Sequence, residues 1–170
     1  RAYRSADCPV LAQLSYDTVH SVNARGYTMA QLHVLATGQV DLAAWDRSFR
    51  EHDTVVAVED GCIVGVADMD TVGYLDRLHV HKIISEGIAT VLCDQPEGVH
   101  RASFTTLTSV IAHSFFEKRG YRVLQELQAE RGGLGLTNFV IEKAKKMLCG
   151  KKFPQGFFYC LEVNEEYCGG

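Results

Sequence analysis

The spacing of apolar residues changes along this chain, from a repeat of three or four residues to a repeat of two. Apolar residues recur at helical spacing over residues 10–22, and Asp7 is the predicted N-cap of this helix. Thr28 and Gln31 form the capping box of a second predicted helix, which we expect to end at Gly38. Two shorter elements are also predicted: a strand over residues 1–4 and a helix over residues 42–49.

Alternation of apolar and polar residues predicts strands from residue 54 onward. The pair Asp60-Gly61 is a strong hairpin signal between two of them, residues 54–58 and 63–69. After the turn at Gly73 we predict a strand over residues 74–80, a helix that begins near Gly87 and stops at Pro96 and Gly98, and a strand over residues 103–107. The last predicted elements are a helix from its N-cap Ser109 to Arg119, with Gly120 as the C-cap, and an antiparallel pair over residues 121–127 and 136–142.

This order of elements predicts an α+β fold, with a central, mostly antiparallel mixed sheet and helices on both faces. A length of 170 residues suits a single domain. The composition, with 46% hydrophobic and 22% charged residues, is that of a soluble globular protein. No apolar run approaches the ~18 residues that a membrane helix needs, and the N-terminus lacks a secretory pattern. We therefore expect a cytoplasmic protein with no membrane partner.

Charge and cysteine usage narrow the range of partners. The net charge of −4 argues against a nucleic-acid partner, because phosphate binding needs a concentrated basic face. Eight acidic residues between residues 41 and 70 form either a solvated surface or an acidic rim that attracts a cationic amine. The six cysteines include no Cys-x-x-Cys pair and are expected to be free thiols. His79 and His81 share a strand face, but no third ligand has a matching spacing, so no metal site is predicted.

Two blocks of sequence carry candidate chemistry. In the first, residues 73–80 end a strand, and a short loop leads into a helix that opens near Gly87. The first N–H groups of a helix have no partner within it and carry partial positive charge, which suits a diphosphate. A glycine there lets a ligand approach the backbone closely. The second block, residues 112–121, is a predicted helix that ends at a glycine.

Together these blocks resemble the GCN5-related N-acetyltransferase (GNAT) superfamily, which transfers acetyl from acetyl-CoA to an amine. The family pattern is a strand ending in Leu-x-Val, a Gly-x-Gly/Ala loop and a helix ending in Phe-Tyr-x-x-x-Gly. Residues 78–80, 87–89 and 115–121 fill those places in that order. The resemblance covers residues 1–143, which we expect to form one domain with the acyl-CoA N-acyltransferase fold. Residues 144–170 are then a C-terminal extension, interpreted as an edge strand, a dimer contact or a disordered tail.

The resemblance implies that acetyl-CoA is the cosubstrate and that its acetyl group passes directly to a small-molecule amine. In the family, the pantetheine of the cofactor lies between two strands that splay apart, and the N–H at the position of Val80 stabilises the oxyanion. The cofactor site that the resemblance implies consists of Leu78, His79, Val80, Ser85, Glu86, Gly87, Ile88, Ala89, Thr90, Ser109, Phe115 and Phe116.

The chain departs from the family pattern in its pyrophosphate-binding loop, which is degenerate. The loop from Val80 to Gly87 is one residue shorter than usual, with Ile84 where the family has Gln or Arg. Glu86 beside the glycine repels a diphosphate, and Lys82 is the residue that compensates.

The two proton-transfer positions also differ. Phe116 occupies the place of the family's acid Tyr, and Tyr74 the place where some members have a Glu base. Our leading base candidate is Asp76, with Asp68 and Asp70 behind it, so Asp76 and Tyr74 are the predicted catalytic residues. The alternatives to an active enzyme are a catalytically degenerate protein that binds acyl-CoA or another ligand, and an interaction module whose tail forms a homodimer or recruits a partner.

Overall fold

The structure is a computed structural model that describes residues 1–82, 85–98 and 102–144. Its helices are η1 (Ser5–Asp7), α1 (Cys8–Ser21), η2 (Asn23–Arg25), α2 (Met29–Leu35), α3 (Leu42–Glu51), α4 (Ser85–Glu97) and α5 (His113–Lys118). Its strands are β1 (Asp53–Glu59), β2 (Cys62–Met69), β3 (Leu75–Val80), β4 (Ser103–Ser109), β5 (Arg122–Arg131) and β6 (Leu134–Ala144). The predicted α+β fold class is confirmed, and no helix within the described ranges is long and apolar enough to span a membrane.

The strands form two three-stranded antiparallel sheets, in the orders β1-β2-β3 and β4-β6-β5. A parallel bridge between Tyr74 and Thr105 joins them, with the Thr105 N–H donating to the Gly73 carbonyl at 3.0 Å. The Thr106 hydroxyl donates to the Leu75 carbonyl at 2.7 Å. No longer ladder joins β3 to β4 among the described residues, so the two strands are held together only where they begin.

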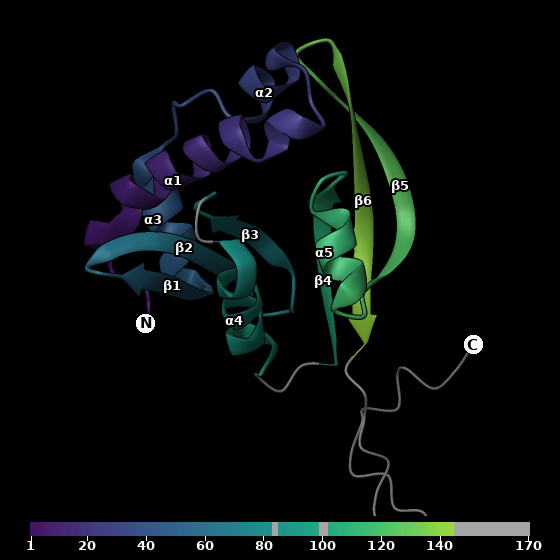
Figure 1. Cartoon of the computed structure of the whole chain (residues 1–170). Coiled ribbons are helices and arrows are strands. Elements are labelled where there is room, and N and C mark those ends of the chain that lie inside the picture. The colour runs from purple at the N-terminus through teal and green to yellow at the C-terminus, as the bar shows by residue number, and fades with distance from the viewer. Residues whose placement is uncertain (83–84, 99–101, 145–170) are drawn as a thin grey trace, which may run out of the picture.

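Helices α1 and α3 lie on one face of the first sheet and α4 on the other, while α5 packs against the second sheet (Figure 1). The central strand β2 is covered on both faces, and every residue from 64 to 69 is buried. Helix α2 reaches the far end of the second sheet, where the Gln31 amide donates to the Gly135 carbonyl at 2.8 Å. Helices α1 and α2, with the segment that connects them, therefore extend from the first sheet to the tip of the β5–β6 hairpin.

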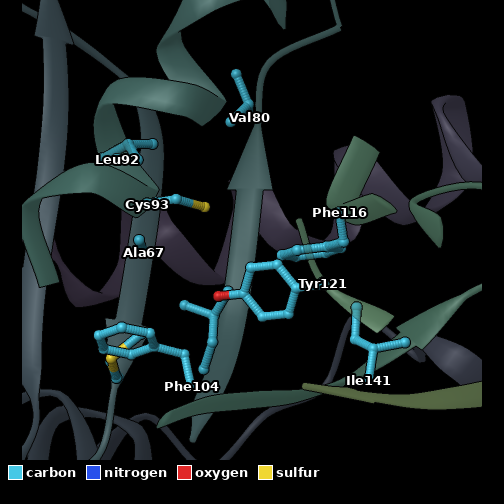
Figure 2. Packing of buried hydrophobic residues seen from close by; sticks show 10 residues of the cluster. Ala67, Val80, Leu92, Cys93, Phe104, Phe116, Tyr121 and Ile141 are labelled. Atoms are coloured by element: carbon cyan, nitrogen blue, oxygen red, sulfur yellow. The ribbon is translucent and has the colours of Figure 1, made fainter. Parts of the chain in front are cut away.

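Two hydrophobic clusters fill the faces of the first sheet. The cluster under α1 and α3 contains Cys8, Leu11, Leu14, Phe49, Val56 and Val66. The other cluster continues from α4 to α5 and the second sheet, and contains Leu75, Val80, Leu92, Cys93, Phe104, Phe116, Tyr121 and Ile141 (Figure 2). Because this second cluster draws on both sheets, it fixes the base of the opening between β3 and β4.

Several predicted local signals are confirmed. Thr28 and Gln31 make both capping-box hydrogen bonds at the start of α2. Asp60 and Gly61 have φ angles of 49° and 78°, the left-handed pair that a tight hairpin turn requires. Gly120, with φ of 86°, follows the end of α5.

Other predictions need correction. Asp7 occupies the predicted N-cap position of α1, but its side chain makes no capping hydrogen bond, because its carboxylate accepts from the Arg4 N–H and from the Arg1 guanidinium. Residues 1–4 contribute only an isolated bridge between Ala2 and Val55. Ser109 is the last residue of β4, and α5 begins later, at His113. The final strand pair is longer than predicted and runs to the turn at Gly132-Gly133. Ala144, the first residue of the predicted extension, ends β6, and the rest of that extension, residues 145–170, lies outside the described residues.

Candidate active site

A cavity of about 760 Å³ lies where the ends of β3 and β4 are no longer paired. Residues from α1 and η2 form one wall, and residues from α4 and α5 form the other. The end of β3 supplies the floor through Leu78 and Val80, and the Val80 carbonyl accepts from the Thr18 hydroxyl at 3.4 Å. Six predicted cofactor residues line this cavity: Leu78, Val80, Gly87, Ala89, Thr90 and Phe115.

Four other predicted cofactor residues do not line it. His79 lies opposite α1, with its Nε2 3.2 Å from the Ser15 hydroxyl. Ile88 packs on the α4 side of the core and lines a separate groove beside β1. The Ser109 hydroxyl accepts from the Ala112 N–H at 3.3 Å, which is a turn interaction before α5.

Phe116 is the fourth, and it is only 3% exposed. Its ring meets that of Tyr121 edge to face, with the centroids 5.1 Å apart, inside the core cluster (Figure 2). The family's acid position therefore points into the core in this chain. Ile84 lies outside the described residues, and so do the side chains of Ser85 and Glu86.

The half-buried position of His79 has an electrostatic consequence. Loss of hydration disfavours the imidazolium form, and the positive charge of Arg77 adds to the effect, so the pKa of His79 falls to about 4. A neutral imidazole is therefore expected at physiological pH, where it shares a hydrogen bond with Ser15.

Gly87 gives the first turn of α4 an unusual backbone. Its φ angle is 103°, a conformation that residues with a side chain rarely adopt, although a Cβ there would meet no atom within 4 Å. The glycine is thus required by the backbone rather than by crowding. It lines both the cavity and the groove beside β1, so the start of α4 stands between the two hollows.

The described charged residues that line the cavity all have one sign. Arg25, Lys82 and Lys118 line it, and no described lining residue is a carboxylate or a histidine. Sequence reasoning named Lys82 but missed Arg25 and Lys118, because these belong to η2 and to the end of α5 and share no motif. Thr18 and Asn23 are further lining residues that only the fold brings there.

The predicted catalytic residues lie away from this lining. Tyr74 immediately precedes β3 at the bridge to Thr105, and burial, followed by the charge of Asp76, raises its pKa. Asp76 is the extra residue of a β-bulge, because Arg77 pairs with Asp68 and Leu75 pairs with Met69. The Asp76 carboxylate lies 3.0 Å from the Arg77 guanidinium.

The second-choice base candidates have structural partners. Asp68 is fully buried and accepts from Arg77, from Nδ1 of His52 at 2.9 Å and from the Thr54 hydroxyl at 2.9 Å. Asp70 accepts from the backbone N–H groups of Val72 and Tyr74 and so shapes the turn before β3.

Several of the acidic residues between residues 41 and 70 have structural roles and do not form a free acidic rim. Asp41 caps α3 through the N–H groups of Ala43 and Ala44, at 3.0 Å each. Asp46 accepts from the Tyr3 hydroxyl at 2.8 Å and pairs with Arg50. With Asp68 and Asp70, at least half of the eight acids are therefore engaged in caps, turns and ion pairs.

Comparison with known families agrees with this geometry. Residues 23–143, well over half of the chain, match the family model for the acetyltransferase (GNAT) domain. The chain belongs to the GNAT acetyltransferase family. No curated protein matches it.

Solved structures agree as well. A GCN5-related N-acetyltransferase from Rhodopseudomonas palustris is 26% identical, with a TM-score of 0.77 over 85% of this chain and 94% of that one. PaiA N-acetyltransferase from Thermoplasma acidophilum, solved in complex with coenzyme A, is 14% identical, with a TM-score of 0.69 over 85% and 97%. A ribosomal-protein-alanine N-acetyltransferase from Brucella melitensis is 18% identical, with a TM-score of 0.62 over 85% and 98%. The last two likenesses concern the fold alone.

Proposed function

We propose that this GNAT acetyltransferase binds acetyl-CoA in the cavity between β3 and α5 and transfers the acetyl group directly to a small-molecule amine. The observation that carries the proposal is the charge of the cavity. The chain has a net charge of −4, yet the described lining of the cavity holds three cations and no carboxylate. This charge suits a cofactor with several phosphates. The complex of PaiA with coenzyme A, which has the same fold, supports this choice of ligand.

The pantetheine arm would lie along Leu78 and Val80, which are the cavity residues of β3. There the amine nitrogen attacks the thioester carbonyl carbon, and the C–S bond breaks as the new C–N bond forms. The amine loses one proton overall, and the departing CoA thiolate takes up one. A donor aimed at the carbonyl oxygen lowers the barrier, and we assign this role to the Val80 N–H.

The route of the proton follows from the same lining. No described residue that lines the cavity is a carboxylate or a histidine, so the described lining offers neither of these bases to an ammonium ion. We therefore expect the acceptor to react as the neutral amine, with water rather than Asp76 taking its proton. Tyr74 stays protonated at neutral pH because its pKa is raised, so it does not fit a base, and it does not line the cavity.

The first experiment is calorimetric titration of the purified protein with acetyl-CoA and with CoA. Micromolar binding is expected, and it justifies screening polyamines, aminoglycosides and simple primary amines by the release of CoA thiol. An absence of binding at millimolar cofactor would refute the proposed enzyme.

The positions of two side chains favour a second candidate function, a protein that binds its ligand without catalysis. Phe116 is buried in the core, and Asp76 is paired with Arg77. Tight binding of acetyl-CoA, together with no thiol release across the amine screen, would support this candidate over the enzyme. A homodimer, a cytoplasmic location and the absence of a nucleic-acid partner also belong to the proposal, and the net charge of −4 supports the last of these.

A further inference from the structure

The three cations of the cavity differ from most other described basic residues in having no counter-charge. Arg1 pairs with Asp7, Arg77 with Asp68, and both Arg119 and Lys143 with Glu97. Within the described residues, no carboxylate lies within ion-pair distance of Arg25, Lys82 or Lys118. Positive charge that is not neutralised by the protein raises the local potential and attracts an anion.

These cations come from elements that are distant in the chain. Arg25 ends η2, Lys82 follows β3, and Lys118 ends α5, so the cavity receives charge from three sides. All three are exposed, whereas Leu78 and Val80, which also line the cavity, are half-buried and buried apolar residues of β3. The arrangement matches an elongated ligand with an uncharged arm inside and anionic groups outside.

The sequence around the start of α4 has the opposite character. It carries Ile84 in place of a polar or basic residue just before the helix, and Glu86 next to Gly87 within its first turn. A carboxylate beside a bound phosphate costs binding free energy, since like charges repel at short range. The sequence of this loop therefore leaves most of the phosphate charge to be balanced by residues outside it.

We propose that Arg25, Lys82 and Lys118 form a side-chain clamp that recognises the phosphate groups of the cofactor in place of the degenerate loop. The inference rests on the proposed function, because it assigns the residues that hold acetyl-CoA in the same cavity. It also specifies the acyl donor: the protein selects thioesters that carry a nucleotide with several phosphates, and not a bare acyl-pantetheine. Arg25 and Lys118 are then specificity-determining residues.

The test is calorimetric titration of CoA into Arg25→Gln, Lys82→Gln, Lys118→Gln and the triple variant, at low and at high ionic strength. Arg47→Gln is the matched control, because Arg47 is an exposed cation on α3 that does not line the cavity. At low salt we expect each clamp variant to bind CoA about 5-fold more weakly and the triple variant about 100-fold more weakly. The differences should shrink at high salt, since exposed charges are screened.

The outcomes separate the clamp from the proposed function. A triple variant that keeps wild-type affinity would overturn the clamp while leaving the acetyl-CoA site intact. A loss of affinity that does not depend on salt, or an equal loss in Arg47→Gln, would also overturn it, because neither is a local charge effect. Failure of the wild-type protein to bind CoA at either ionic strength would refute the proposed function itself.

Discussion

Replacing Asp68 with Asn tests the structural role that we assign to the buried acid under α3. Asp68 has no exposed surface and accepts hydrogen bonds from Arg77, His52 and Thr54. The guanidinium of Arg77 stacks 4.8 Å from the centre of the Trp45 ring, so it has little freedom to turn toward water. Asp68→Asn removes the negative charge but keeps the shape of the side chain.

The expected cost follows from the charge that is left behind. Removing one partner of a buried ion pair destabilises a protein by about 3–5 kcal/mol, because the other charge stays buried. Here Asp76 remains 3.0 Å from Arg77, so we expect the lower end of that range, about 3 kcal/mol. At about 2–4 °C for each kcal/mol, the melting temperature should fall by about 6–12 °C.

Asp76→Asn is the matched control, because it removes the other carboxylate bound to the same Arg77. The Asp76 side chain is 37% exposed, against 0% for Asp68, so its ion pair should contribute less than about 1 kcal/mol. Thermal and urea unfolding of both variants measure the difference. Equal losses of stability would refute the reasoning, since burial would then not set the energy of the pair. Turnover of Asp76→Asn, once an acceptor amine is known, should also be unchanged.

Three further predictions concern acid–base chemistry, and a fourth concerns the tail. Because the pKa of folded His79 is about 4, against an ordinary 6.5, its contribution to stability is complete above pH 6.5 and is lost as pH falls toward 4. The loss is at most about 3 kcal/mol in urea unfolding, and His79→Gln should abolish this dependence. Phe116→Tyr should cost about 1–2 kcal/mol and should not raise turnover, because the new hydroxyl is buried beside Tyr121. The rate at low amine concentration should rise with pH until the amine itself is deprotonated; a plateau at the pKa of a carboxylate would contradict the neutral-amine route. Deleting residues 144–170 should reduce the mass in solution if the tail forms a dimer, and a monomer both before and after would count against that interpretation.

Signals that act within a few residues were readable from the sequence. The capping box of Thr28 and Gln31 and the turn at Asp60-Gly61 depend only on local backbone geometry, and both are present. The strand that ends at Val80 and the helix that includes Gly87 are also where the pattern placed them. These elements define the cavity, so its position followed from the order of motifs.

Side-chain roles that depend on register were not readable. Strict alternation placed Asp76 on the face of Tyr74, but the bulge adds one residue and brings Asp76 to Arg77 instead. In the structure, an oxygen of the Asp76 carboxylate lies within 4.8 Å of a ring nitrogen of His52 and of a carboxylate oxygen of Asp68. Nothing in one sequence shows such a bulge, because it arises from the pairing of β2 with β3.

Asp7 illustrates the same limit at a helix start. Its spacing ahead of Pro9 and Val10 is that of an N-cap, yet Arg1 and the Arg4 N–H bind its carboxylate more directly. Arg25 and Lys118 could not be linked to Lys82 either, since they lie on elements that meet only in the folded chain.

The distribution of charge joins the fold to the proposed chemistry. Acids that were candidates for a binding rim instead cap α3, shape the turn before β3 and neutralise Arg77. The cations at the cavity have no such partners within the described residues, although the whole chain is acidic. A site with this imbalance suits a phosphate-rich donor, whose phosphates would neutralise the three cations once it is bound. The amine would then have to arrive in its neutral form, which is the form that can attack the thioester, because no described lining residue is a carboxylate or a histidine that could take its proton.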